Sequence, residues 1–124
     1  MKLIIFLDKD QDKSNEEKET LAKLSAGNLY YQLSKEDQDK ISEEEESFLN
    51  GIIVETATLT KTNKPIVFNY YKVSHTPTIV FSNESEVIYH WEKIPNLSEI
   101  VKSMVSYFKI LKLSELDYDY DPEE

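Results

Sequence analysis

The chain has 124 residues and no cysteine, and it carries 24 acidic side chains against 14 basic ones, all of them lysine. The missing thiols exclude thiol–disulfide chemistry, and a net charge of −10 argues against nucleic-acid binding through phosphate neutralisation. An apolar fraction of 40% at this length predicts one globular domain that needs no disulfide or metal to stabilise its core.

The N-terminal half begins with a continuous apolar run, Lys2 to Leu7, which predicts a strand buried on both faces. Ser14-Asn15-Glu16-Glu17 fits a capping box, in which the Ser14 hydroxyl and the Glu17 carboxylate satisfy N–H groups at a helix start. A helix is expected to follow. Leu29 to Leu33 fits either the end of that helix or a short strand after Gly27-Asn28.

The middle of the chain is strongly charged. Ser34-Lys35-Glu36-Asp37 is a second possible helix start, and the stretch after it runs through four consecutive glutamates to a stop at Asn50-Gly51. Ile52 to Leu59 then predicts a strand. A further helix is expected to open at Thr62-Asn63-Lys64-Pro65, because proline is tolerated in the first turn of a helix.

The C-terminal half predicts a hairpin followed by a helix. Two apolar runs, 78–81 and 86–91, are joined by four polar residues, a connection short enough to make the strands antiparallel. Leu97 to Leu113 has the spacing of an amphipathic helix. We therefore expect a domain over residues 1–113 and an acidic, disordered tail over residues 114–124.

The ordered elements from Thr62 onward carry a resemblance. Tyr71 to Phe81, with the sequence Tyr-Lys-Val-Ser-His-Thr-Pro-Thr-Ile-Val-Phe, resembles the thioredoxin superfamily segment that leads into its cis-proline strand. The resemblance covers roughly residues 52–113. It implies a thioredoxin-like three-layer α/β/α sandwich with a mixed sheet, a C-terminal hairpin and a final helix. It also implies a cis bond at Thr76-Pro77.

In relatives of this superfamily the backbone before the cis-proline pairs with an extended peptide, beside a Cys-x-x-Cys motif at a helix N-terminus. The resemblance implies that His75, Thr76 and Pro77 form a peptide-docking edge here. Two segments compete for the motif position. The hydrophobicity of the first strand favours residues 11–17, whereas spacing to the proline favours residues 34–37. Neither contains a thiol, so we expect no catalytic residue and no cofactor.

Two weaker patterns begin at Asp8. Asp8, Asp10, Asp12 and Glu19 occupy positions of a calcium-binding loop, although Lys13 stands where such a loop needs glycine. Asp8 and Asp10 after an apolar strand also resemble the first motif of haloacid-dehalogenase phosphatases, as nucleophile and general acid of a magnesium-dependent enzyme. The simpler interpretation of both is a solvated loop before a capped helix, so our expectation is no metal.

The acidic segments suggest a different kind of binding. One acidic surface is expected from the four glutamates Glu43, Glu44, Glu45 and Glu46 and the tail residues Asp117, Asp119 and Asp121. Such a surface suits a basic, nucleic-acid-binding partner, for which the chain would act as an inhibitor or decoy. The leading hypothesis remains a non-catalytic protein that contacts an unidentified protein partner, with no direct contact to nucleic acid or membrane.

The cellular location and the source of the protein can be predicted only from general features of the sequence. The apolar run at the N-terminus is too short for a secretory signal or a membrane span, so we expect a cytoplasmic protein. The lysine-rich, arginine-free composition suits an AT-rich genome, such as that of a thermophile or a virus. The sequence does not indicate an oligomeric state.

Overall fold

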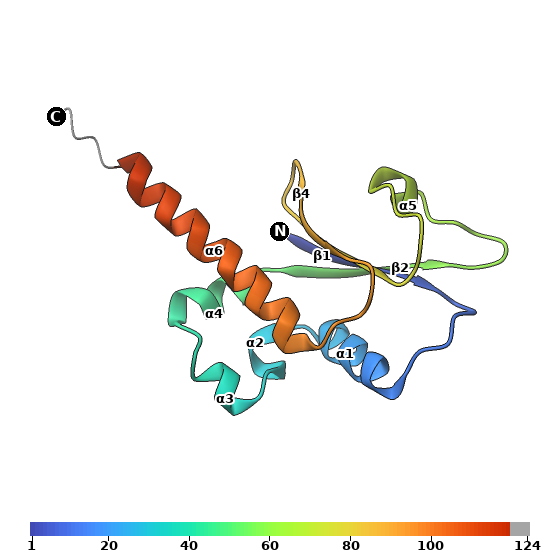
Figure 1. Ribbon diagram of the computed structural model, residues 1–124, viewed down its shortest axis with the longest axis horizontal. Helices are drawn as coiled ribbons and strands as arrows, with labels where there is room; N and C mark the ends of the chain where they lie inside the picture. Colours follow the sequence, from blue (N-terminus) through green and yellow to red (C-terminus); the bar gives the residue numbers. More distant parts are fainter. Residues whose placement is uncertain (120–124) are drawn as a thin grey trace.

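The computed structural model describes residues 1–119, with side chains as far as residue 114. It combines a four-stranded mixed sheet with helices on both sides (Figure 1). In chain order the elements are β1 Lys2–Asp8, α1 Asn15–Ala26, α2 Leu29–Gln32, α3 Lys35–Gln38, α4 Glu43–Asn50, β2 Ile53–Leu59, α5 Val67–Tyr70, β3 Thr78–Ser82, β4 Val87–Trp91 and α6 Leu97–Asp119.

The strands lie in the order β2-β1-β3-β4. β1 is parallel to β2 and antiparallel to β3, and β3 forms an antiparallel hairpin with β4. These pairings confirm the predicted mixed sheet and the C-terminal hairpin, and the helices around them, α6 included, confirm the α/β class and the final helix. They also place the apolar run of β1 between two other strands, where side chains on both faces are covered.

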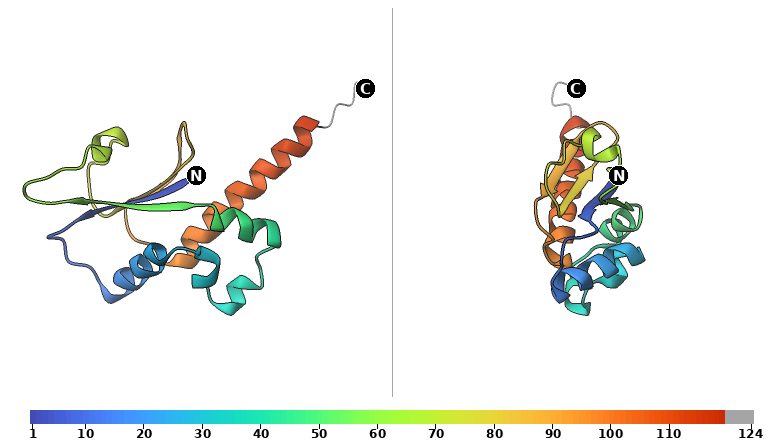
Figure 2. Two further views of the ribbon diagram at one scale, coloured as in Figure 1. Left: turned by 180° about the vertical axis from the view of Figure 1, so that it is seen from behind. Right: turned by 90° about the vertical axis from the view of Figure 1, so that its right-hand side faces the viewer.

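Side chains of β1 alternate between two apolar clusters. Leu3 and Ile5 point into the larger one, which is built with α1, α2, α4 and α6. Ile4 and Phe6 point into the smaller one, which is built with β2, β3 and α5. We call these two sides of the sheet the covered face and the α5 face. Figure 2 shows the sheet from behind and from the side, with α6 lying along the covered face.

Serine caps begin three of the helices, α1, α3 and α4. Ser14 and Ser42 each form a complete capping box, with Glu17 and Glu45 respectively, so the predicted box before α1 is confirmed. Ser34 caps α3 in the same way, by accepting from the Asp37 N–H group. These side chains satisfy helix N–H groups that have no partner within the helix.

Several boundaries differ from those predicted. The segment at 29–33, which fitted either a helix or a strand, contains the one-turn helix α2. The charged stretch after Ser34 forms two helices, α3 and α4, rather than one. α6 runs to Asp119, so the first residues of the predicted tail are helical, and residues 120–124 lie outside the described part of the chain. Figure 1 shows its C-terminal half extending beyond the sheet.

The helix expected at Thr62 is much shorter than predicted. α5 is a single turn that begins after Ile66, without a side-chain cap, and leaves Pro65 outside the helix. It stops where Lys72 adopts a left-handed backbone conformation with φ of 56°. Phe68 is buried against Phe6, with ring centroids 5.0 Å apart. One turn cannot cover the face of a four-stranded sheet, so much of the α5 face stays open.

Candidate functional site

The Thr76-Pro77 peptide bond is cis, which confirms the isomer that the resemblance implied. It lies in the loop between α5 and β3. Across this loop the Thr76 hydroxyl donates a hydrogen bond of 2.9 Å to the Gln11 side-chain oxygen, although the two residues are 65 positions apart. The segment beside the proline is therefore the one that leads into α1.

The competing segment, residues 34–37, lies elsewhere. α3 sits beside the start of α6, where Leu33, Asp37 and Lys102 help to line a small hollow of about 40 Å³. Residues 29–50 contain three short helices, α2, α3 and α4. These helices return the chain to β2 without passing the proline loop.

A chain of polar contacts fixes the loop before Pro77. His75 Nε2 lies 3.2 Å from the Glu92 carboxylate, and the Ser74 hydroxyl lies 3.4 Å from His75 Nδ1. The Thr78 hydroxyl donates a 2.7 Å hydrogen bond to the His75 carbonyl. The order serine, histidine, carboxylate is that of a hydrolase, but His75 and Glu92 are each 59% exposed. Water competes for both groups, which weakens the contact between them.

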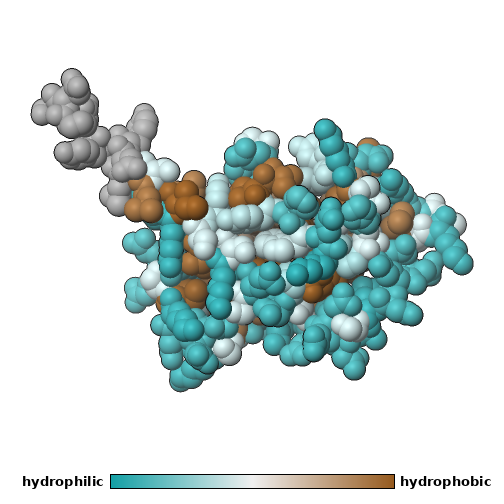
Figure 3. Space-filling view, in the orientation of Figure 1, coloured by the Kyte–Doolittle hydropathy of each residue, from teal (hydrophilic) through white to brown (hydrophobic). Residues whose placement is uncertain are grey.

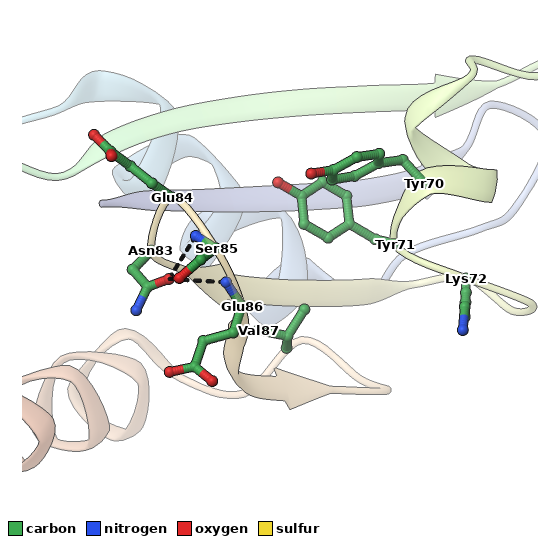
Figure 4. Close-up of a pocket in the computed structure, with 8 residues that line it drawn as sticks. All are labelled: Tyr70, Tyr71, Lys72, Asn83, Glu84, Ser85, Glu86 and Val87. Atoms are coloured by element: carbon green, nitrogen blue, oxygen red, sulfur yellow. Dashed lines mark hydrogen bonds between the residues drawn. The ribbon is translucent and has the colours of Figure 1, made fainter.

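Next to this loop, two adjoining hollows of about 270 and 280 Å³ cross the α5 face. Both are lined by Tyr71, Lys72 and Val87, and we call them together the α5-face groove. One end reaches His75 and His90, and the other ends at the β3–β4 turn. Figure 4 shows the rings of Tyr70 and Tyr71 extending over the sheet from α5 at the turn's end of the groove.

The β3–β4 turn forms a firm wall for this groove. The Asn83 side-chain oxygen accepts hydrogen bonds from the backbone N–H groups of Ser85 and Glu86, each at 2.8 Å (Figure 4). Such an Asx turn holds the backbone in place without a contribution from the rest of the sheet. The groove therefore has a fixed turn on one side and a tyrosine pair, with ring centroids 4.8 Å apart, on the other.

A third hollow of about 540 Å³ continues from the tyrosines toward β2, and Met1, Ile53 and Val67 help to line it. Large apolar side chains gather on this side. Tyr70 is 74% exposed and Ile53 is 54% exposed. Figure 3 shows apolar surface in separate patches along the upper rim of the molecule, set among hydrophilic residues. Exposed aromatic and aliphatic groups beside a hollow are typical of a protein-binding surface.

The residues of the weak calcium-loop pattern have other partners or face solvent. The Asp8 carboxylate accepts a 2.9 Å hydrogen bond from the Asp10 N–H group, and Glu19 pairs with Lys23 at 3.1 Å. Asp10 and Asp12 are exposed. Within the side chains that the structure describes, no three histidines or carboxylates come together as a metal ion would require. Asp8 and Asp10 stand at the end of β1, where the phosphatase pattern had placed them.

The acidic surface is divided. Glu43 and Glu44 are exposed on the first turn of α4, but Glu45 is only 6% exposed. Its carboxylate accepts a hydrogen bond from the Ser42 N–H group and lies 3.7 Å from the Lys109 ammonium, so it stabilises the contact between α4 and α6. Asp117 and Asp119 belong to α6, with side chains beyond those described, and Asp121 lies outside the described residues.

Sequence reasoning missed Glu92, included Gln11 only as the first residue of the 11–17 segment, and did not connect Tyr70 with a groove beside the proline. Gln11 and Glu92 carry no local signal, because their partners Thr76 and His75 become neighbours only through the fold. Tyr70 had one available signal: it directly precedes Tyr71, and two adjacent residues at the end of a helix point in different directions. One of the two tyrosines therefore had to leave the core.

The chain matches no protein-family model, no curated protein and no solved structure. Among the described residues, no helix combines the length and the apolar character needed to cross a membrane. A function for this chain has to be inferred from the geometry of the α5-face groove and of the loop beside it.

Proposed function

We propose that this chain is a non-catalytic, thioredoxin-like domain that binds a protein partner by docking an extended segment into the α5-face groove. The segment would run from the loop at His75, Thr76 and Pro77, past Tyr71, to the β3–β4 turn. No redox step is involved, because the chain contains no cysteine.

The arrangement of strands supports the thioredoxin-like part of this proposal. The resemblance implied a mixed sheet with a C-terminal hairpin and helix, and the order β2-β1-β3-β4 has a parallel pair next to an antiparallel hairpin. The contact between Gln11 and Thr76 supports the assignment of residues 11–17 to the position that holds the redox motif in relatives. In this chain that position holds a polar loop and the serine cap of α1.

The chemistry of the groove supports peptide binding. Its floor is apolar, with Val80 and Val87, while its rim carries Lys72, His75 and Glu92. Apolar floors bind side chains and polar rims orient a backbone, which is how pockets for alternate residues of an extended peptide work. The exposed ring of Tyr70 adds a large contact area at low entropic cost, as tyrosine does in many interfaces.

The single observation that carries the proposal is the length of α5. Because the helix stops after one turn, the sheet face next to Pro77 is left with an open groove instead of a packed helix. The decoy hypothesis has less support, because Glu45 is engaged between α4 and α6.

A displayed library of random linear peptides tests this proposal, because it finds ligands for the groove even when the natural partner is unidentified. Selected peptides are measured against Tyr70→Ala and against Tyr31→Ala as a matched control. Both tyrosines are strongly exposed, at 74% and 64%, but Tyr31 lies on α2, away from the groove. We expect Tyr70→Ala to weaken binding about tenfold or more, the loss typical of an interface hot spot.

Amide chemical shifts of labelled protein locate the same peptides. We expect the amide chemical shifts to change on peptide binding only at residues 70–76 and 83–92. Peptides that lose affinity in Tyr31→Ala but keep it in Tyr70→Ala would contradict the proposal, and so would a library that yields no binder above background. Binding through residues 43–46 with a steep salt dependence would favour the decoy hypothesis instead.

A further inference from the structure

The outer edge of β2 is unpaired in the described part of the chain, since β2 ends the sheet and pairs only with β1. Hydrogen bonds at the two ends of β2 show which of its backbone N–H and C=O groups point inward, toward β1. The Ile53 N–H group donates to the Met1 carbonyl, and the Leu59 carbonyl accepts from Lys9, so both residues point toward β1. Because successive residues of a strand alternate in direction, Val54, Thr56 and Thr58 point their N–H and C=O groups outward.

Nothing in the strand blocks this edge from pairing. Edge strands are usually protected by proline, by a lysine, by a bulge or by shortness. β2 has seven residues in unbroken register with β1, no proline and no lysine. Its one charged side chain, Glu55, is balanced by Lys2 at 3.3 Å. By contrast, β4 at the opposite edge has five residues and a register shift beside it.

We propose that β2 pairs with β2 of a second copy of this chain, antiparallel about a two-fold axis at Thr56, and so joins two sheets into one. This register lets Thr56 exchange both backbone hydrogen bonds with Thr56 of the second copy, while Val54 does so with Thr58 of the second copy. All of the outward groups are then used, which no other register of two identical strands achieves.

Side chains agree with this register. On the α5 face it places Ile53, which is 54% exposed, opposite Leu59 of the second copy, and Glu55 opposite Ala57. A shift that put the two Glu55 side chains opposite each other would be disfavoured by repulsion. The hollow beside Ile53, with Met1 and Tyr70, then faces the end of the partner strand, where apolar surface is available to fill it.

The backbone pairing of this interface uses the outer edge of β2, whereas the α5-face groove lies over β3 and β4, and Tyr70 borders both the groove and the hollow beside Ile53. A domain that presents two copies of one groove binds a partner with repeated segments more tightly than a single copy does. The dimer does not depend on the groove being functional, and either proposal can fail without the other.

Amide hydrogen exchange of the wild-type protein tests the dimer directly. In a single copy, the inward amides of β2 are protected while those of Val54, Thr56 and Thr58 face solvent. In the proposed dimer all of them are protected. We expect exchange of the outward three to slow by about tenfold or more as protein concentration rises, in step with a doubling of mass by sedimentation. A monomer at every concentration, or a dimer whose outward amides stay fast, would overturn the proposal.

Two variants at one position sharpen the test. Thr56→Pro removes an outward N–H group without removing a bond to β1, and proline is tolerated at such edge positions. Thr56→Val keeps the N–H group and the branched shape, so it is the matched control. We expect the first to be monomeric and the second to dimerise.

The dependence of dimerisation on salt concentration is a further test, and it can be measured on the wild-type protein alone. Each copy carries a net charge of −10, so screening should strengthen the dimer as ionic strength rises. A dimer that persists unchanged in a folded Thr56→Pro, or that dissociates as salt is added, would place the contact elsewhere and refute the pairing of β2 strands.

Discussion

The two faces of the sheet are made from the same strands, yet they differ in what packs on them. On the covered face Leu3 and Ile5 are fully buried beneath four helices. On the α5 face Ile4 and Phe6 are buried under a single turn of helix and the loop that follows it. The strand residues are buried to a similar extent on both faces, but the α5 face has open hollows next to them and the covered face is packed with helices.

Helix starts explain part of this difference. On the covered face, α1 and α4 begin with capping boxes at Ser14 and Ser42. α5 is preceded by Ile66, which has no side chain able to accept a hydrogen bond, and its end at Tyr70 is soon followed by the left-handed Lys72. A single turn without a cap cannot be stable by itself, so α5 depends on Phe68 and Tyr71 packing against Phe6. The face with weak helix signals is the one that keeps an open groove.

Ile4 and Ile5 make this comparison measurable, because they are neighbours of one type that point to opposite faces. Ile5→Ala should lower the free energy of unfolding by about 4 kcal/mol, since close packing under the helices leaves a cavity. Ile4→Ala should cost about 2.5 kcal/mol, because Ile4 borders the open hollow beside Ile53 and its surroundings can relax.

Chemical denaturation of both variants provides the measurement, with Ile4→Val and Ile5→Val as milder controls. Equal losses for the two alanine variants would mean that the α5 face is as tightly packed as the covered face. The case for an open groove would then fail.

Most elements of this fold could be predicted because their signals are local. The apolar run of β1, the serine cap before α1 and the four-residue link of the hairpin each depend on neighbouring residues. The cis bond before Pro77 was predictable only through the resemblance, on the residues around it. Local rules were therefore enough for the strands and for the start of the main helices.

The rest depends on contacts between distant residues. The pattern of Val67, Phe68 and Tyr71 fits a longer helix, but Lys72 ends it, and lysine has no preference for the left-handed conformation that it adopts here. Gln11 and Thr76 meet through two loops at one end of the sheet. Burial of Glu45 arises from α6, which comes much later in the chain. No short window of sequence contains these contacts.

Lys72 offers a second, smaller test of the comparison. A residue with a side chain is strained at φ of 56°, whereas glycine is not, although glycine loses more freedom on folding. Lys72→Gly should therefore raise the free energy of unfolding by about 0.5 kcal/mol. Asn28 on the covered face has φ of 51°, but asparagine tolerates this conformation well, so Asn28→Gly should change stability by less. Thermal unfolding of both variants measures these changes. A lower stability of Lys72→Gly than of the wild type would show that the Lys72 side chain stabilises the end of α5.

Tyr30 gives the smallest effect and reports on the covered face alone. Burial raises the pKa of its phenol above the ordinary value of 10.0, and the Glu46 and Asp39 carboxylates raise this pKa further. Above about pH 10 the unfolded chain therefore loses the Tyr30 proton before the folded chain does. The stability that depends on the neutral phenol is complete below that pH and declines as pH rises through the raised value.

Chemical denaturation of the wild type, Tyr30→Phe and Tyr31→Phe at about pH 9 and about pH 11 isolates the contribution of the Tyr30 phenol to stability. Each variant differs from the wild type in a single titrating group, the phenol that it lacks. Tyr30→Phe should lose less stability over this interval than the wild type, since it has no phenol to ionise at that position. Tyr31→Phe removes an exposed phenol from the same helix and is the control for the loss of a tyrosine hydroxyl there. If Tyr30→Phe and the wild type decline in parallel, then α2 leaves Tyr30 as accessible as a residue on the open face, and the covered face is looser at this helix than its packing indicates.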